Sequence, residues 1–250
     1  MERVYIFDVD GTLTGSRQPM HDIFSDFFQN MISQVPVYLV TGSNLEKLQQ
    51  QVPEQILNRV AGVFTCSGNE LWQSGKRIFK KDHRFPAEMI AFVERLLRQS
   101  NYTIRTGRHV ETRPGMLNVS VVGRNANLQQ RNAYNRFDHE AGERRVIMAR
   151  IREAFPEYEA NQGGQISVDV SLKGWNKSRV HAHVQEKHGA AECYFFGDNI
   201  KKGGNDFPLA KAILDAGRGN RVFPVKCYDD TWEILQEHFA ANVELASRVA

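Results

Sequence analysis

The stretch VYIFDVDGT, residues 4–12, decides how the rest of the chain is interpreted. Four apolar, β-prone residues lead into Asp8, and a second acid, Asp10, is followed at once by a glycine. The run over 4–7 predicts a short buried strand that ends at Asp8. A helix is expected after the glycine turn, because apolar residues recur at i, i+3 and i+4 spacing over 20–32. The chain therefore begins with a strand, an acidic loop and a helix.

The same alternation of strand and helix continues along the chain. The next expected elements are a strand over 37–40, a helix over 45–52 and a strand over 60–66. Short buried strands that alternate with helices predict a parallel sheet with helices on both faces. Such sheets bind ligands beyond the carboxyl ends of their strands, where Asp8, Thr41 and Ser67 fall. We expect a functional site at that edge.

The regular alternation of strands and helices ends after residue 71, where shorter strands are expected instead. We therefore expect an inserted α+β domain over 82–173, within a core formed by 1–81 and 174–250. The expected elements here are a hairpin over 71–79, helices over 87–98 and 140–154, and strands over 102–104, 109–112, 116–122 and 165–170. The alternation then returns with helices over 177–188, 208–216 and 231–247 and strands over 192–196 and 221–225. The sequence predicts an α/β protein with a Rossmann-like parallel-sheet core and an α+β cap.

Composition sets broad limits on the function. Hydrophobic residues make up 41% and charged residues 24% of the chain, which is typical of a soluble globular protein. No apolar run approaches the roughly 20 residues of a membrane helix, and the start lacks a signal peptide, so we expect a cytoplasmic protein. The three cysteines form no CxxC pair, which argues against a disulfide framework or a zinc site. The net charge of +3 gives no support for nucleic-acid binding.

Asp8 and Asp10 carry the strongest chemical signal. Alternate residues of an extended loop can point the same way, so the two carboxylates can converge. Asp8 can then attack phosphorus to form an aspartyl phosphate, and Asp10 can pass protons to and from a hydroxyl or water. Because close carboxylates repel each other, a divalent cation is expected, and Mg²⁺ prefers carboxylates with phosphate oxygens and water. The alternative is an acidic turn that caps a helix.

A second set of residues completes the predicted chemistry. Asp198 follows a strand end and a glycine, and Asp206 follows shortly after, so both are candidates for the metal site. Lys177 lies at the start of a helix, where it can neutralise Asp8 and a transferring phosphoryl group. Thr41 can offer its hydroxyl to a phosphate. The alternative for Asp198 and Asp206 is a loop with helix-capping residues. Taken alone, Thr41 is equally consistent with an N-cap, and Lys177 is more typical of an exposed lysine.

In their order along the chain, these elements resemble the four signatures of the haloacid-dehalogenase superfamily. The signatures are the Asp-x-Asp-Gly-Thr strand end, the strand-end Thr41, Lys177 before a helix and the Gly-Asp pair at 197–198. The resemblance implies that Asp8 is the nucleophile, that Mg²⁺ is the cofactor, and that a cap is inserted after the third strand.

Longer blocks are similar to the eukaryotic-type phosphomannomutase family. These are DVDGTLT (8–14) followed by Arg17, RPGMLNVS (113–120), GGQISVD (163–169), and FFGD (195–198) followed by GGND (203–206). The resemblance implies a phosphosugar held between core and cap. The residues implied to bind it are Arg17, Ser43, Arg113, Arg124, Arg131, Ser167 and Asp169. Those implied in catalysis are Asp8, Asp10, Thr41 and Lys177, and those implied in metal binding are Asp8, Asp10, Asp198 and Asp206. Without the resemblance, the arginines are equally typical of a solvated basic surface.

Some positions depart from the family pattern. Pro114, Val121, Asn176 and Ile200 stand where the family usually has other residues, and CSGNE (66–70) replaces its usual Ser-Glu-Asn-Gly. Ile200 removes a hydroxyl near the expected metal loop. These departures bear on substrate preference more than on the chemistry.

The resemblance implies a phosphomannomutase of mannose metabolism that interconverts mannose 1-phosphate and mannose 6-phosphate. The expected route passes through phospho-Asp8 and a hexose bisphosphate, with hexose 1,6-bisphosphate as activator. Two alternatives stay open, a magnesium-dependent sugar-phosphate phosphatase and a catalytically silent phosphate-binding protein. Glucose phosphate is an alternative substrate. A homodimer through the cap is also possible, since an apolar stripe at Met89, Phe92, Val93 and Leu96 can serve a dimer or simply pack the cap.

Overall fold

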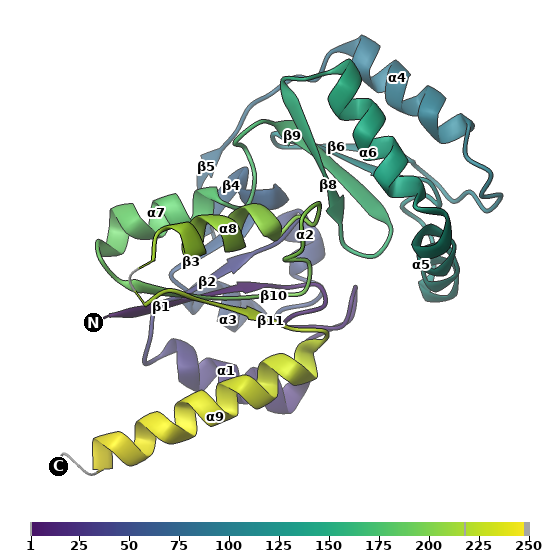
Figure 1. The fold of residues 1–250 in the computed structure, drawn as a ribbon. Helices are drawn as coiled ribbons and strands as arrows, with labels where there is room; N and C mark the ends of the chain where they lie inside the picture. Colours follow the sequence, from purple (N-terminus) through teal and green to yellow (C-terminus); the bar gives the residue numbers. More distant parts are fainter. Residues whose placement is uncertain (1, 218, 248–250) are drawn as a thin grey trace.

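The computed structural model describes residues 2–217 and 219–247, and within them it shows two α/β units, each built on its own sheet (Figure 1). The larger sheet has the strand order β11-β10-β1-β2-β3-β4-β5 and the smaller one β6-β7-β9-β8. Strands of the larger sheet are β1 (Arg3–Asp8), β2 (Val37–Val40), β3 (Gly62–Thr65), β4 (Glu70–Gln73), β5 (Lys76–Lys80), β10 (Glu192–Gly197) and β11 (Arg221–Pro224). Strands of the smaller sheet are β6 (Val110–Arg113), β7 (Met116–Ser120), β8 (Tyr158–Gly163) and β9 (Ser167–Leu172).

The larger unit, which we call the core, is a three-layer sandwich. Strands β11, β10, β1, β2 and β3 pair in parallel, and β4 and β5 add an antiparallel edge. Figure 1 shows α7 and α8 on one face of this sheet and α1 and α9 on the other. The helices of the core are α1 (Asp22–Ile32), α2 (Leu45–Leu48), α3 (Glu54–Arg59), α7 (Arg179–His188), α8 (Phe207–Asp215) and α9 (Tyr228–Ser247), with a single 3-10 turn at Cys66–Gly68. The predicted α/β class with a mainly parallel core sheet is confirmed.

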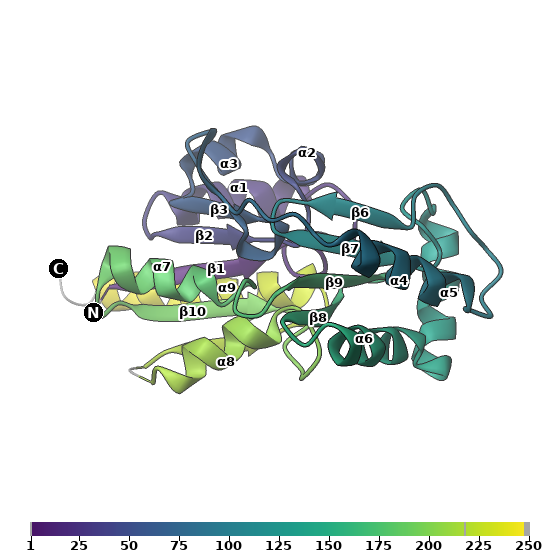
Figure 2. The same cartoon turned by 90° about the horizontal axis from the view of Figure 1, so that it is seen from above.

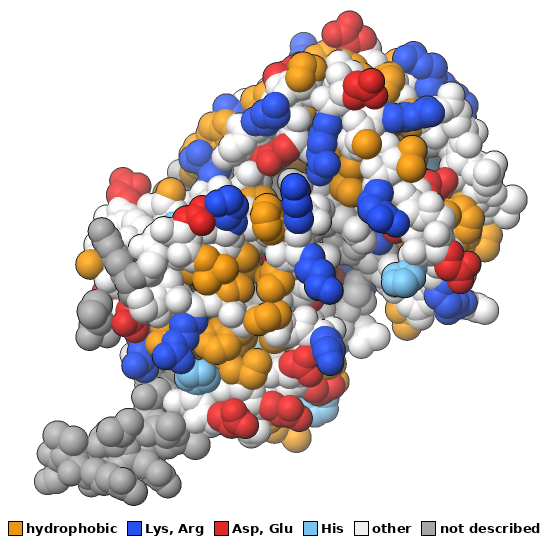
Figure 3. Space-filling model, in the orientation of Figure 1, with side chains coloured by type: hydrophobic (Ala, Val, Ile, Leu, Met, Phe, Trp, Pro, Cys, Tyr) orange, Lys and Arg blue, Asp and Glu red, His pale blue; other side chains and the backbone are white. Residues whose placement is uncertain are grey.

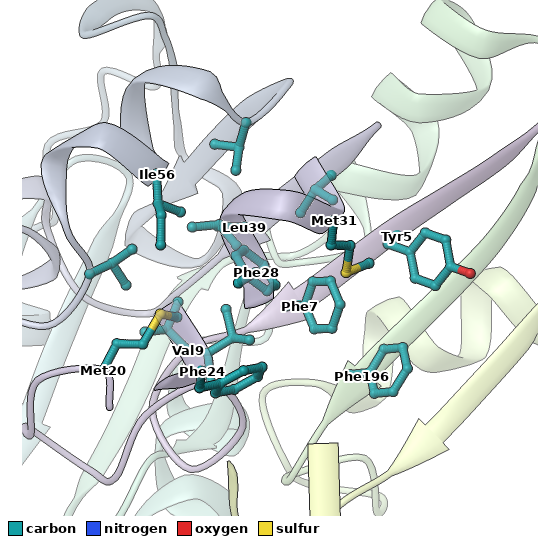
Figure 4. Packing of buried hydrophobic residues seen from close by; sticks show 14 of the residues in the cluster. Tyr5, Phe7, Val9, Met20, Phe24, Phe28, Met31, Leu39, Ile56 and Phe196 are labelled. Carbon is teal, nitrogen blue, oxygen red and sulfur yellow. The ribbon is translucent and has the colours of Figure 1, made fainter. Parts of the chain in front are cut away.

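Strand β1 lies at the centre of the core, and its alternate residues face the two helical layers. The Phe7 ring packs 5.2 Å from Phe28 of α1 and 4.8 Å from Phe196 of β10 (Figure 4). Ile6 points the other way, into the cluster under α7 and α8. Because both faces of β1 are covered, the position of Asp8 at its end is fixed by the packing of the whole core.

The smaller unit, the cap, is an antiparallel sheet with helices α4 (Ala87–Arg98), α5 (Leu128–Ala141) and α6 (Glu143–Ala154). Figure 2 shows it beyond the carboxyl ends of β1, β2 and β10. The stripe on α4 packs inside the cap: Met89, Val93 and Leu96 are buried in its hydrophobic cluster, and Phe92 packs against that cluster. The stripe therefore fills the cap interior, and a homodimer through the cap stays a prediction.

Several local elements differ from the sequence-based expectation. Residues 102–104 form no strand, while α3, α5 and β8 were not expected. The helix expected over 140–154 begins later, at Glu143, because Gly142 adopts φ 65° and separates it from α5. Helix α5 begins with a capping box in which Asn127 and Gln130 exchange hydrogen bonds. These differences lie in polar segments, where the period of apolar residues is weak.

Two linkers join cap and core, one between β5 and α4 and one between β9 and α7. They meet at Trp175, whose ring stacks on Phe79 at 6.1 Å and lies 3.9 Å from both the Lys81 ammonium and the Arg179 guanidinium. Asn69 also joins the two linkers. Its backbone carbonyl accepts from the Lys81 backbone N–H, and its side-chain amide donates to the Trp175 backbone carbonyl. The boundaries 1–81, 82–173 and 174–250 stay a prediction.

The visible surface mixes charges of both signs over core and cap, with Lys and Arg side chains gathered near the crease between the two units (Figure 3). Of the helices in the described part of the chain, none combines the length and apolarity that crossing a membrane requires.

Helix α7 brings two uncharged histidines against the core. The Nε2 atoms of His181 and His183 are buried without a hydrogen-bond partner, and the His183 ring packs 5.7 Å from Tyr38 and 5.4 Å from Phe64. Burial lowers the pKa of both rings. A lowered folded-state pKa means that the unfolded chain binds more protons, so these groups favour unfolding as pH falls below their unfolded pKa of about 6.5.

We expect His183→Phe to protect the protein at mildly acidic pH. Thermal unfolding of variant and wild type should be compared between pH 7.5 and 5.5, and the variant's advantage in melting temperature should grow as pH falls. His139→Phe, on α5 of the cap, is the control for an exposed histidine. A constant difference across this range would show that His183 does not take up a proton on unfolding.

Candidate active site

Three neighbouring parallel strands bring the predicted catalytic loops together. In the register of the sheet, Phe7 pairs with Phe196 and Asp8 with Val40, so the segments after β10, β1 and β2 leave at the same edge. A cavity between this edge and the cap has a volume of about 50 Å³. It is lined by Asp8, Asp10, Ser16, Arg17, Thr41, Gly42, Ser43, Arg113, Asn118, Arg124, Arg131, Gly163, Gly164, Gln165, Ser167, Asp169, Asp198 and Asn205. Lys177 and Asp206 lie behind Asp8, outside this lining.

Lys177 joins the two buried carboxylates at the base of the cavity. Its Nζ donates to Asp8 Oδ1 at 2.5 Å and to Asp206 Oδ1 at 2.7 Å, and its side chain is fully buried. Burial alone would lower the pKa of Lys177, but the charges of Asp206 and Asp8 outweigh it and raise the pKa well above the usual range. The lysine is therefore held as a cation beside Asp8.

The acids around Lys177 carry more negative charge than one lysine balances. Carboxylate oxygens of Asp8, Asp198 and Asp206 all lie within 4.8 Å of one another. Burial, which Lys177 only partly offsets, raises the pKa of Asp8. Asp198 as a whole residue is exposed, but its carboxyl group is largely shielded from water. This loss of hydration, followed by the charge of Asp206, raises the pKa of Asp198 to about 7. These oxygens suit a hard divalent cation such as Mg²⁺.

Gly11 makes room for this arrangement. It adopts φ 90°, and a Cβ there would lie 2.7 Å from Asp198 Oδ2. The glycine of the Asp-x-Asp-Gly-Thr motif therefore lets Asp198 approach the end of β1.

Asp10 lies outside the group of three clustered acids. Its Oδ1 accepts hydrogen bonds from the Arg17 backbone N–H at 3.0 Å and from Gln51 Nε2 at 3.1 Å. Both bonds hold the carboxylate at the cavity wall, which suits a group that moves protons. Its role as a metal ligand stays a prediction.

The cap contributes a cluster of arginines to the opposite wall. Arg124 Nη1 donates to Ser167 Oγ at 2.8 Å, Arg131 Nε donates to Gln165 Oε1 at 3.2 Å, and Arg113 Nη1 donates to the Gly42 carbonyl at 2.5 Å. Burial, then neighbouring arginines, lower the pKa of Arg124 to about 9 and that of Arg131 to about 10. Guanidinium groups that are largely buried and repel one another favour a bound anion, and their forks match a phosphate.

The remaining predicted residues complete the cavity between these walls. Thr41 and Ser43 are buried, and the Ser43 N–H donates to Thr41 Oγ1 at 3.0 Å. Asp169 accepts from Asn118 Nδ2 at 2.6 Å, and burial raises its pKa. Of the site residues expected from the sequence, all line the cavity except Lys177, which bonds to Asp8, and Asp206, which bonds to Lys177.

Other polar residues at the site were not expected. Asn118, Gln165 and Asn205 line the cavity, and Gln51 holds Asp10. Asn118, Gln165 and Asn205 lie in the family-like blocks RPGMLNVS, GGQISVD and GGND, and these blocks are the sequence signal that marks them. No sequence signal marks Gln51, because only the fold brings its side chain to Asp10.

Comparison with known proteins connects this site to one family. A model described as eukaryotic phosphomannomutase matches residues 24–241. The phosphomannomutase of Saccharomyces cerevisiae is 32% identical over 247 residues, covering 95% of this chain and 94% of its own. That of Dendrobium officinale is 31% identical over 247 residues, covering 96% of this chain and 95% of its own.

Solved structures with similar folds are much more distant in sequence. An IMP-bound IMP-nucleotidase of Plasmodium falciparum gives a TM-score of 0.63 at 15% identity, over 94% of this chain and 67% of its own. A trehalose-6-phosphate phosphatase related protein gives 0.56 at 14% identity, over 96% and 99%. A haloacid dehalogenase-like hydrolase of Bacteroides thetaiotaomicron gives 0.54 at 12% identity, over 85% and 86%. At such identities the similarity concerns the fold, which is haloacid-dehalogenase-like.

Proposed function

The chain belongs to the eukaryotic phosphomannomutase family, and we propose that it interconverts mannose 1-phosphate and mannose 6-phosphate through a phosphorylated Asp8. The observation that carries the proposal is the pairing, across one narrow cavity, of Asp8 with the cap arginines Arg113, Arg124 and Arg131. A mutase needs two binding positions at the same time, one where a nucleophile reacts with one phosphate and another where the second phosphate is bound.

The core residues support the phosphoryl transfer itself. Asp8 attacks phosphorus, and the bond from phosphorus to the sugar oxygen breaks as the aspartyl phosphate forms. Lys177 neutralises Asp8 and the charge that develops on the phosphoryl oxygens, and Thr41 donates its hydroxyl to them. Asp10 gives a proton to the leaving sugar oxygen and later removes one from the attacking hydroxyl. Asp8, Asp198 and Asp206 would hold Mg²⁺, which supplies further charge stabilisation when bound.

The cap residues support the exchange between the two phosphate positions. Arg113, Arg124 and Arg131 grip whichever phosphate is not reacting, with Arg17, Ser43, Ser167 and Asp169 around the sugar. Phospho-Asp8 first transfers its phosphoryl group to the free hydroxyl of the bound hexose monophosphate, which frees the Asp8 carboxylate and forms a hexose bisphosphate. The bisphosphate turns within the cavity, and Asp8 attacks its other phosphate, which releases the isomeric monophosphate and restores phospho-Asp8. Hexose 1,6-bisphosphate would prime the enzyme by the same route.

Closure of the cap favours transfer to sugar over transfer to water. The cavity of about 50 Å³ is far smaller than the ~300 Å³ of a typical small ligand site, so in the proposed cycle the cap opens to admit the substrate. Backbone hydrogen bonds between Gln162 of β8 and the core loop at Gly203 and Asn205 close one side. Water kept out by these contacts cannot hydrolyse the aspartyl phosphate.

Phosphorus NMR tests the proposal directly. The enzyme is incubated with Mg²⁺, mannose 1-phosphate and a trace of hexose 1,6-bisphosphate, and in parallel with glucose 1-phosphate. Mannose 6-phosphate with little free phosphate is the expected product. Free phosphate as the main product would identify a sugar-phosphate phosphatase. No turnover of either sugar phosphate or of an aryl phosphate would leave a phosphate-binding protein.

Arg124→Ala should separate the two phosphate positions. We expect the KM for mannose 1-phosphate to rise about 10- to 100-fold, because a charge-assisted hydrogen bond contributes ~1.5–3 kcal/mol. Hydrolysis of an aryl phosphate, which has no second phosphate, should change less than threefold. Arg150→Ala removes an exposed cap arginine and serves as the control. Equal losses on both substrates would argue against a distal-phosphate role for Arg124.

A further inference from the structure

Behind the arginine wall of the cavity lies an ion-pair cluster that joins the two units. Lys47 of the core helix α2 donates to both carboxylate oxygens of Glu111 of the cap strand β6, at 2.7 and 2.8 Å. Among the described residues, two ion pairs join the core to the segment 82–173. One is Lys47–Glu111, and the other is Lys80–Asp82, which lies within the first linker. Neither Lys47 nor Glu111 lines the cavity.

The same carboxylate also holds the arginines that line the cavity. Arg113 Nη2 donates to Glu111 Oε2 at 2.7 Å, and Arg124 Nε lies 3.2 Å from that oxygen as an ion pair. The three side chains are at most 13% exposed, and Lys47 is 19% exposed. One carboxylate thus connects a core lysine to two of the guanidinium groups proposed to bind phosphate.

This cluster holds more positive than negative charge. Lys47, Arg113 and Arg124 share Glu111. Asp169, which accepts from Asn118, also faces the charges of Arg113 and Arg124, so three cations meet two carboxyl groups. Burial and then the charge of Arg113 lower the pKa of Lys47 to about 8, more than Glu111 offsets. At Glu111 burial acts to raise the pKa, but Arg113 and Lys47 lower it to about 2. The cations therefore carry more charge than the carboxyl groups beside them, so binding of an anion would stabilise this arrangement.

We propose that Lys47 is a positioning residue that couples binding of the substrate's non-reacting phosphate to closure of the cap on the core. Closing the cap brings Lys47 to the arginines, and the repulsion between these cations opposes closure until a phosphate dianion balances them. Once the phosphate is bound, the bridge from Lys47 through Glu111 holds the arginines against the core. The inference rests on the proposed function for the role of the arginines.

Direct binding tests the inference without relying on mutase turnover. An Asp8→Asn parent is titrated with hexose 1,6-bisphosphate and Mg²⁺ in a calorimeter. Adding Lys47→Met should raise the Kd about tenfold, because it removes one cation and the link between the units. Adding Lys47→Arg should leave the Kd within about twofold of the parent, since it keeps the charge. Lys80→Met, which removes the exposed pair with Asp82, is the matched control and should have no effect.

The pH dependence of the same binding separates charge from structure. Between pH 7.0 and 8.5 the phosphate stays dianionic, since its second pKa is about 6. The charged groups that face Lys47 are Glu111 and Arg113 of β6 and Arg124. Arg124, whose pKa is lowered to about 9, is present in both the parent and the Lys47→Arg protein, so its titration affects both alike. Lys47 loses its proton in this range, so the Kd of the parent should rise with pH more steeply than that of the Lys47→Arg variant.

Two results would overturn the inference. One is a Kd for the Lys47→Met protein within about twofold of the parent, or no different from that of Lys80→Met. The other is the same pH dependence with lysine and with arginine at position 47. Failure of the proposed function is seen separately, as free phosphate in the NMR experiment with the wild-type protein.

Discussion

Replacing Asp8 by asparagine is expected to lower kcat by more than about 10⁴-fold while the protein stays folded. An amide cannot act as the nucleophile, so neither transfer to sugar nor hydrolysis can begin. The fold should persist because asparagine has nearly the same shape. It also removes one of three carboxylates that lie within 4.8 Å of one another, which relieves their repulsion. Turnover of mannose 1-phosphate and of an aryl phosphate, with thermal unfolding alongside, provides the measurement.

Asp215→Asn is the matched control for this change. Asp215 is an exposed carboxylate at the end of α8, paired with Lys211, and its loss should leave kcat unchanged. Near wild-type activity in the Asp8→Asn protein would rule out Asp8 as nucleophile. Loss of activity together with loss of the folded state would leave only a structural role for this carboxylate.

Lys177→Met should impair both stability and catalysis. The substitution leaves Asp8 and Asp206 buried beside each other without a cation, and removing one partner of a buried ion pair costs ~3–5 kcal/mol. We expect the free energy of unfolding without Mg²⁺ to fall by about that amount. kcat should fall about 10³-fold, the range for losing a preorganised charge at a reacting centre. Urea unfolding without Mg²⁺ and initial rates with Mg²⁺ measure the two effects.

A double variant separates the two roles of Lys177. Adding Asp206→Asn to Lys177→Met removes one of the unpaired carboxylates, so much of the stability should return while kcat stays low. Lys173→Met, an exposed lysine close by in the sequence, is the control and should change neither quantity. Unchanged stability in the Lys177→Met protein would contradict the buried ion-pair network. Restored activity in the double variant would show that Lys177 acts on stability alone.

The core and its strand-end residues could be predicted because their signals are local. The apolar run before Asp8 encodes β1, and the same rule placed Thr41 after β2 and Asp198 after β10. In a parallel sheet these ends meet at one edge, so three short runs were sufficient to predict that Asp8, Thr41 and Asp198 lie together, as they do in the cavity lining. The cap arginines came from the family resemblance, since their spacing alone is also typical of a solvated surface.

What could not be predicted depends on contacts between distant or weakly patterned segments. The apolar residues of α5 form no continuous stripe, so its helical period was not recognised although Asn127 and Gln130 carry a capping signal. Lys47 and Glu111 are 64 positions apart and belong to different units. No local pattern marks such a pair, because it exists only once the cap lies against the core.

The stack around Trp175 has a mechanical consequence. One indole ring packs against residues on both sides of the cap insertion, Lys81 before it and Arg179 after it, so the two linkers are fastened to each other. Two linkers joined at one point allow the cap to rotate about that point but restrict other movements. Two independent linkers would allow the cap to move in more directions relative to the core. Trp175 is also an intrinsic fluorophore, so in a variant that lacks Trp72 and Trp232 its emission would report the cap movement that the proposed function requires.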